Sequence, residues 1–234
     1  MQIIDVSEYD IRSAVITMRR RGTPLEFVIF PMVHAAPPTF FAQVRRRLRE
    51  CDLIVVEGIR GKSAVVSTLT LAYRLAAWRR RNGLQEQRDE LLLPEGVPVI
   101  RLETTAADAA ADLRALPWWT LLFLMVLAPV GGLVIALWGP RALLHKAMAV
   151  EYLATSEEAE PAADDDAVHH ALAYRRDRRV LDALAEIHEQ RAGEPIRVAV
   201  VYGAGHVPAI VSGLLERYGY RPRGAEWLTV YAAA

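Results

Sequence analysis

The sequence predicts an α/β fold: a mixed central β-sheet flanked by helices, with an inserted hydrophobic helical hairpin. Short apolar runs rich in β-branched residues alternate with segments of helical periodicity, which is typical of this class. Two of the apolar runs end alike, because residues 27–33 lead to His34 and residues 197–203 lead to His206. In α/β sheets, ligands collect beyond the carboxyl ends of strands. We therefore expect the two histidines to meet at one site.

Composition limits the classes of function. A chain of 234 residues is long enough for one core, so we expect a single domain over residues 1–234. The 28 basic and 28 acidic side chains cancel, and we expect no nucleic-acid partner. Cys51 is the only cysteine, so no intrachain disulfide can form, which favours a reducing compartment. The first residues show no pattern of a secretory signal.

The N-terminal part predicts a hairpin followed by a helix. Residues 13–18 and 25–30 are β-rich runs separated by a polar turn with glycine and proline, which indicates an antiparallel pair. Pro37 and Pro38 suit the first turn of a helix, where a missing N–H costs little. The helix is amphipathic, because an apolar residue recurs every fourth position among arginines, at Phe40, Val44 and Leu48.

Two more strands end in carboxylates. Residues 52–58 predict a buried strand that carries Glu57 near its end, and an apolar helix is expected over 63–78. Residues 97–105 predict another strand, with Glu103 near its end. A threonine directly after Glu103 can cap the alanine-rich helix that follows.

The C-terminal part predicts alternating helices and strands. Residues 155–167 are acidic and poor in apolar side chains, so we expect a solvated loop there. Residues 168–190 form a strong helical pattern, and 197–203 the second strand that leads to a histidine. A helix over 208–218 and a final strand over 226–231 complete the chain.

Residues 117–138 carry no charge and are apolar enough to interact with a membrane. About 20 apolar residues can span a bilayer, and tryptophans lie near both ends, as in an interfacial belt (Trp118, Trp119 and Trp138). Pro129 and the Gly131-Gly132 pair fall in the middle, where they favour a kink or a reversal. We therefore predict a helical hairpin over residues 115–150.

A single membrane crossing would put His34 and His206 on opposite sides of the bilayer. The hairpin is therefore expected to dip into lipid, with the protein membrane-associated on the cytoplasmic side. Two alternatives remain open. One is an ordinary buried helical hairpin in a cytoplasmic protein. The other is an interface of a soluble homodimer.

Four polar residues lie at predicted strand ends: His34, Glu57, Glu103 and His206. Two imidazoles and one or two carboxylates suit a divalent metal such as manganese, cobalt or zinc. Such a metal lowers the pKa of bound water and polarises a carbonyl, which is the basis of metal-assisted hydrolysis. The HExxH pattern is absent, so the ligands would come from separate strands. The alternative for each histidine is a structural role, without metal binding or catalysis.

Gly203-Ala204-Gly205 invites a second interpretation as a dinucleotide-binding turn. That motif needs a further glycine at position 208, where the chain has Pro208. Glu226 is about as far on as the acidic residue of that motif, but the chain ends before a second half-fold could complete the cofactor crevice. No Walker-type loop is present. We expect no nucleotide cofactor.

Short motifs resemble the TraB/GumN/Tiki superfamily and, more distantly, the erythromycin esterase and ChaN-like proteins. Gly203-Ala204-Gly205-His206 is similar to the C-terminal GxxH of that family, and Ile54-Val55-Val56-Glu57 to its strand-end glutamate. Leu102-Glu103-Thr104 and Arg176-Asp177 resemble two further motifs in the family order. The resemblance covers roughly residues 25–215. At the first GxxH, Pro31 stands where the family has glycine.

The resemblance implies a metal-dependent hydrolase or peptidase that acts on a peptide or small molecule. By position, His34, Glu57 and His206 would bind the metal. Glu103 would be a further ligand or the base that acts on water, and Arg176 would stabilise a developing oxyanion. The alternative within the same family is a membrane-associated module that binds or signals without catalysis.

Overall fold

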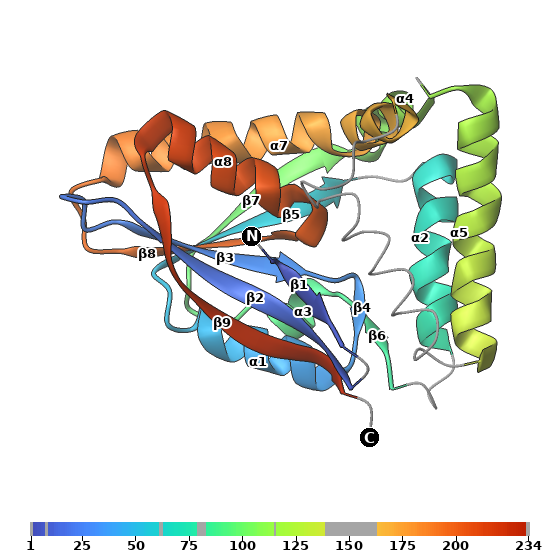
Figure 1. Cartoon of the computed structure of the whole chain (residues 1–234), viewed down its shortest axis with the longest axis horizontal. Helices are drawn as coiled ribbons and strands as arrows, with labels where there is room; N and C mark the ends of the chain where they lie inside the picture. Colours follow the sequence, from blue (N-terminus) through green and yellow to red (C-terminus); the bar gives the residue numbers. More distant parts are fainter. Residues whose placement is uncertain are drawn as a thin grey trace.

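The computed structural model describes residues 2–7, 9–60, 63–78, 83–114, 116–138 and 163–232. Within these ranges the chain forms a mixed sheet flanked by helices (Figure 1). The α/β fold class that the sequence predicts is therefore confirmed.

The main sheet of the described residues has seven strands in the order β1-β2-β3-β8-β5-β7, with β9 paired to β2. The four strands from β3 to β7 run parallel to one another, whereas β1 and β9 are antiparallel to β2. The hairpin of β2 and β3 confirms the predicted antiparallel pair. The strands are β1 (Ile4–Val6), β2 (Asp10–Arg19), β3 (Glu26–Met32), β5 (Leu53–Arg60), β7 (Val99–Thr105), β8 (Arg197–Gly203) and β9 (Arg221–Ala232).

The central strands are apolar because both of their faces are covered. In β8, three consecutive residues, Val198, Ala199 and Val200, are fully buried. A two-stranded sheet of β4 (Ala35–Ala36) and β6 (Gln85–Glu86) lies beside the main sheet.

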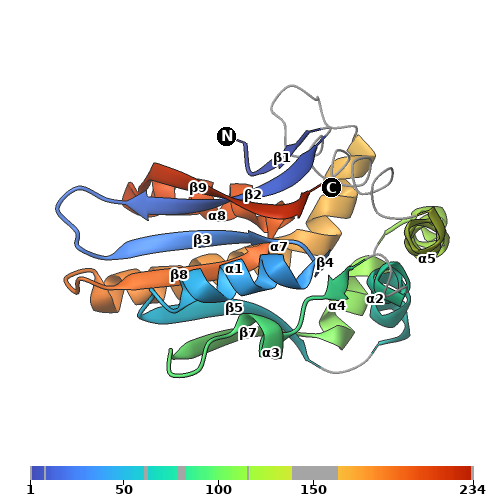
Figure 2. The same cartoon turned by 90° about the horizontal axis from the view of Figure 1, so that it is seen from below.

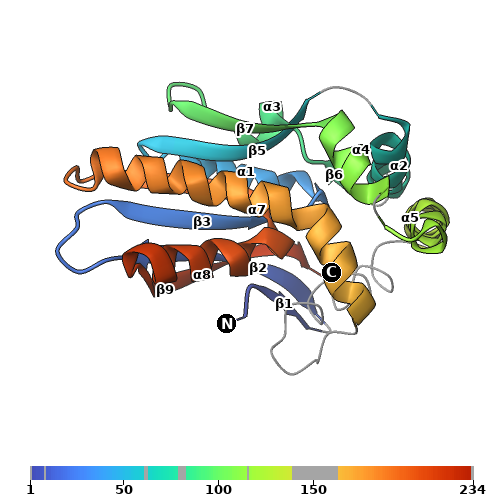
Figure 3. The ribbon, with the colours of Figure 1, turned by 90° about the horizontal axis from the view of Figure 1, so that it is seen from above.

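Helices cover the sheet on two sides. Figure 2 shows α1 and α3 on one face, and Figure 3 shows α7 and α8 on the other. The described helices are α1 (Pro38–Leu48), α2 (Ala64–Trp78), α3 (Asp89–Leu92), α4 (Ala106–Arg114), α5 (Trp118–Trp138), α7 (Ala163–Arg191), the 3₁₀ turn η2 (Ala204–His206) and α8 (Val207–Tyr218).

Helix α7 begins earlier than expected. Its predicted core residues Val180, Leu184 and Ile187 are buried, which confirms the helical pattern. The expected acidic loop is wrong at its C-terminal end, because residues 163–167 belong to α7. Residues 155–162 lie outside the described part of the chain.

The hydrophobic segment forms one continuous helix, so the reversal expected at Pro129 and Gly131-Gly132 is wrong. A proline removes one backbone hydrogen bond. The packing of α5 along α2 compensates for that loss. A Cβ on Gly132 would lie 2.3 Å from the backbone oxygen of Ala72, so the two helices approach closely at this glycine. Any turn in residues 139–150 lies outside the described residues.

Helices α2 and α5 lie side by side beyond the carboxyl ends of the strands (Figures 1 and 3). Helix α5 is long and apolar enough to cross a membrane, with a mean hydropathy of 2.5 over Trp118–Leu137. Only 11% of that stretch is buried. The helix therefore exposes an unusual amount of apolar surface.

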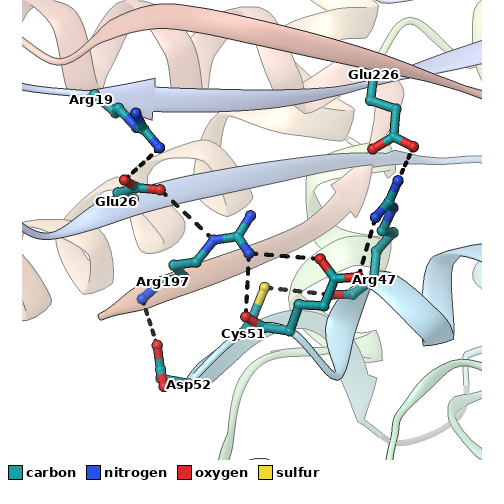
Figure 4. A network of polar contacts seen from close by, with 8 residues as sticks. Arg19, Glu26, Arg47, Cys51, Asp52, Arg197 and Glu226 are labelled. Atoms are coloured by element: carbon teal, nitrogen blue, oxygen red, sulfur yellow. Dashed lines mark hydrogen bonds and ion pairs between the residues drawn. The ribbon is translucent and has the colours of Figure 1, made fainter. Parts of the chain in front are cut away.

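A polar network fixes the opposite, amino end of the sheet (Figure 4). The backbone N–H of Arg197 donates to the Asp52 carboxylate at 2.8 Å, which joins β8 to the start of β5. The Arg197 guanidinium lies 3.8 Å from Glu26, and Arg19 pairs with the same carboxylate at 2.7 Å. These contacts link β2, β3, β8 and β5 at this edge of the sheet.

Candidate active site at the carboxyl ends of β5 and β8

The candidate site forms where β5 and β8 end. Glu57 lies near the end of β5, and β8 ends at Gly203, from which η2 carries His206 back over the sheet. A Cβ on Gly203 would lie 3.5 Å from Cδ2 of His206 and 3.9 Å from Oε2 of Glu57. The two side chains therefore converge at this glycine. Helix α7 covers them and supplies Arg176 and Asp177.

Asp177 orients His206. Its Oδ1 lies 2.7 Å from Nδ1 of His206, and both side chains are about nine-tenths buried. When Nδ1–H donates to the carboxylate, the lone pair of the ring is left on Nε2. Nε2 faces Glu57, whose Oε1 is 3.7 Å away. The imidazole is therefore positioned to use Nε2 as a base or as a metal ligand.

Arg176 holds Glu57 in its ionised form. Nη1 of Arg176 donates to Oε1 of Glu57 at 3.0 Å, and both side chains are largely buried. Burial by itself acts to raise the pKa of Glu57. The interaction with His206, followed by the charge and hydrogen bond of Arg176 and by His34, outweighs this effect, and the pKa of Glu57 is lowered.

His34 lies at the edge of the same cluster. It follows β3, and its ring packs against Tyr73 of α2 with 4.8 Å between the ring centroids and a tilt of 44°. The residue keeps exposed surface, and the part of its ring that the protein covers loses water, which lowers the pKa of His34. Glu57 opposes that shift, whereas Arg176 and His206 add to it. The charges of Glu57, Arg176 and His206 therefore all act on the His34 ring.

Glu103 does not join Glu57. In the ladder of β5 and β7, Glu103 pairs with Gly58, and Glu57 pairs with Leu102. Because successive side chains of a strand point to opposite faces, Glu103 and Glu57 lie on opposite faces of the sheet. The expected role of Glu103 as a further ligand or base at this cluster is therefore not supported. Its backbone carbonyl accepts a hydrogen bond from Arg179 at 3.0 Å.

Three contributing residues were not among the predicted site residues. In the sequence, Asp177 stands out only as part of the Arg176-Asp177 motif. It is a single acidic residue within a run of arginines, and this position was the available signal that it pairs with a particular side chain. Tyr202 of β8 meets His206 edge to face at 5.8 Å, and burial raises the pKa of its hydroxyl. Tyr73 lies on an apolar helix and had no sequence signal. Their roles depend on contacts between distant elements.

The cluster could supply some of the ligands that a divalent metal needs, but not all of them. His206 has its Nδ1 held by a carboxylate, the usual arrangement for a metal-binding imidazole. The 3.7 Å between Nε2 and Oε1 is close to the roughly 3.4 Å that separates two ligands of a tetrahedral metal with bonds of about 2.1 Å. Among the described residues, no three His, Cys, Asp or Glu side chains converge as a metal-binding group. The observed cluster therefore offers two ligands, and His34 is the nearby candidate for a third.

The fold and the cluster define an α/β protein with an ion-paired His–Asp and Glu–Arg arrangement at the carboxyl ends of parallel strands. The chain matches no protein-family model, no curated protein and no solved structure. The interpretation of the site therefore rests on its own geometry.

Proposed function

We propose that this chain is a metal-dependent hydrolase, peptidase-like in its chemistry, which associates with the cytoplasmic side of a membrane through α5. The observation that carries the proposal is the cluster of Asp177, His206, Glu57 and Arg176. Side chains from three elements of the fold are largely buried there around Nε2 of His206, which lies 3.7 Å from Oε1 of Glu57. An imidazole held in one orientation beside a carboxylate is an arrangement that acid–base and metal-assisted hydrolysis can use.

In this proposal His206 and Glu57 hold the ion through Nε2 and Oε1, and His34 completes the set. Manganese, cobalt and zinc suit such ligands. The ion would lower the pKa of a bound water and polarise the scissile carbonyl of a peptide or small-molecule substrate. Asp177 keeps the His206 ring in the tautomer that leaves Nε2 free.

Arg176 has two roles in the proposed reaction. Its hydrogen bond keeps the Glu57 carboxylate ionised, which any cation-binding role requires. Its guanidinium also remains positively charged at all working pH values, so it can stabilise the negative charge that develops on the substrate oxygen. The Arg176 side chain keeps about a fifth of its surface exposed, which leaves part of it accessible to a substrate.

One observation favours a second candidate, a membrane-associated module that binds or signals without catalysis. Arg176 already neutralises Glu57, and the described residues contain no three-ligand metal group. In such a module the ion pairs of the cluster would have a structural role and hold α7 against the sheet. Metal content separates the two candidates.

The experiment is metal analysis of protein purified without chelators, together with hydrolysis of peptide and ester panels after loading with manganese, cobalt or zinc. We expect about one ion per chain, and loss of both the ion and the activity in His206→Ala and His34→Ala. Glu103→Gln serves as the matched control, because Glu103 lies on the opposite face of the sheet. Folded variants are verified by circular dichroism. Metal-free wild-type protein with no hydrolysis under any loading would refute the enzyme and favour the module.

A further inference from the structure

We propose that α5 binds a lipid bilayer along its whole length, lying in the plane of the membrane surface without crossing it. The inference rests on the membrane association proposed above and adds how the protein is oriented. It places the carboxyl ends of the strands, and with them the candidate site, on the side that faces the membrane. Figure 1 shows the parallel strands β3, β5 and β7 pointing toward the α2–α5 pair, with α5 outermost.

The outer face of α5 is a continuous apolar stripe. Large exposed side chains recur with the three- and four-residue spacing of one helix face: Trp119, Leu122, Phe123, Val126, Val130, Leu133 and Leu137. A helix of this length extends for roughly 30 Å at 1.5 Å per residue. An apolar surface of this size in contact with water is a strong indication of a membrane or protein partner.

The inner face of α5 is covered by α2. Gly132 lies against the backbone of Ala72, and Ala136 is buried as well. Figure 2 looks along α5 and shows α2 between it and the body of the protein. Lipid can therefore reach only the outer side of α5 while this packing persists.

A crossing is incompatible with these contacts. Gly132 lies five residues before the end of the apolar segment Trp118–Leu137, so a crossing would place it roughly 7 Å from the bilayer centre, still inside the hydrocarbon core of about 30 Å. Ala72 would be carried to the same depth, with Tyr73 next to it and His34 packed against Tyr73. His34 interacts with the charged Glu57 and Arg176, so the polar cluster would enter the hydrocarbon region. Burial of such groups in hydrocarbon is strongly unfavourable.

The surroundings of the stripe favour lipid over a second copy of the chain. Trp118 is 77% exposed at the start of α5, and Trp78 is 69% exposed at the end of α2. Tryptophan concentrates at the membrane interface. Between residues 113 and 150 the sequence has three basic and no acidic side chains, and three arginines follow α2 at 79–81. This charge pattern complements anionic headgroups, whereas two like-charged copies would repel each other.

The test measures immersion depth along α5. Cys51 is the only cysteine, so a Cys51→Ala background allows single nitroxide labels at Leu122→Cys, Val126→Cys, Val130→Cys, Leu133→Cys and Leu137→Cys. The labelled proteins are bound to vesicles of phosphatidylcholine and phosphatidylglycerol. Relaxation by oxygen and by a nickel chelate in electron paramagnetic resonance then gives the depth of each label. Leu215→Cys on α8, also an exposed leucine, is the matched control.

We expect all five labels at one shallow depth and the label at position 215 in water. A profile that is deepest near Val126 and Val130 and shallow at both ends shows a crossing, which overturns this orientation but leaves membrane association standing. Absence of vesicle binding overturns the membrane association as well. Spin–spin broadening in the absence of lipid shows that a second copy covers the stripe, and it too overturns the proposal.

Discussion

Asp177 and His206 are 29 residues apart in sequence, yet the carboxylate of one lies 2.7 Å from Nδ1 of the other. Helix α7 supplies the carboxylate and η2 supplies the imidazole. The pair therefore joins α7, which covers one face of the sheet, to the end of β8. The ring is fixed with Nε2 directed at Glu57. This pair therefore sets the geometry on which the proposed chemistry depends.

Replacing Asp177 by asparagine should lower both metal affinity and hydrolysis about 10- to 100-fold, the usual effect of losing a carboxylate that orients a metal-binding histidine. The amide cannot stabilise the same charge on the ring. Metal titration by calorimetry and initial hydrolysis rates measure the effect. Asp182→Asn is the matched control, because Asp182 lies on the same helix but is exposed and paired with Arg217. Equal effects of the two substitutions would contradict the role of Asp177.

Arg176→Met should destabilise the fold by about 1–3 kcal/mol at pH 7, because a largely buried Glu57 carboxylate loses its charged hydrogen-bond partner. Urea unfolding at several pH values measures this. The pKa of Glu57 is lowered in the folded state, so the stability it contributes is present above its unfolded pKa of about 4.3 and is lost as pH falls through the folded pKa.

The variant should consequently lose stability less steeply than the wild type below pH 4.3. Arg178→Met, an exposed position on the same helix, is the control and should behave like the wild type. A variant whose acid unfolding follows the wild-type curve would show that Arg176 does not set the pKa of Glu57.

Gly132→Ala should loosen the α2–α5 pair, because the added Cβ would lie 2.3 Å from the backbone oxygen of Ala72. Backbone atoms cannot move aside as a flexible side chain can, so the helices must separate. Gly131→Ala is the control, since its Cβ would meet no atom within 4 Å. Hydrogen exchange over residues 64–78 reports the result. Faster exchange in both variants would point to a general effect of losing glycine.

Cys51 should be almost unreactive in the folded protein. Burial raises the pKa of its thiol to about 11. Only the thiolate reacts, and a pKa two units above the ordinary value leaves about 100-fold less thiolate at pH 8. Reaction with a disulfide reagent should therefore be slow in buffer and fast in urea. Rapid labelling of the native protein would show that Cys51 is accessible.

Much of the fold could be predicted from local patterns. The apolar runs of β3, β5 and β8 and the helical period around Val180 show which side chains are buried. These patterns can be recognised in the sequence without knowing the tertiary structure. His206 could also be predicted as a site residue, because strand ends in an α/β sheet converge and the structure places it beside Glu57, whereas the meeting of His34 with His206 stays a prediction. The reversal predicted from Pro129 is wrong, because α5 continues through this proline and packs against α2.

The sequence by itself determined the α/β class, the strands and helices that compose it, and the apolar character of residues 117–138, because these follow from periodicity and composition. Only the tertiary structure decided that Asp177 holds His206, that Arg176 holds Glu57, and that the strand register turns Glu103 to the other face. Those outcomes depend on distances between groups that the chain separates by tens of residues. For Glu103, a shift of one residue in the register of β7 would turn its side chain to the face of Glu57.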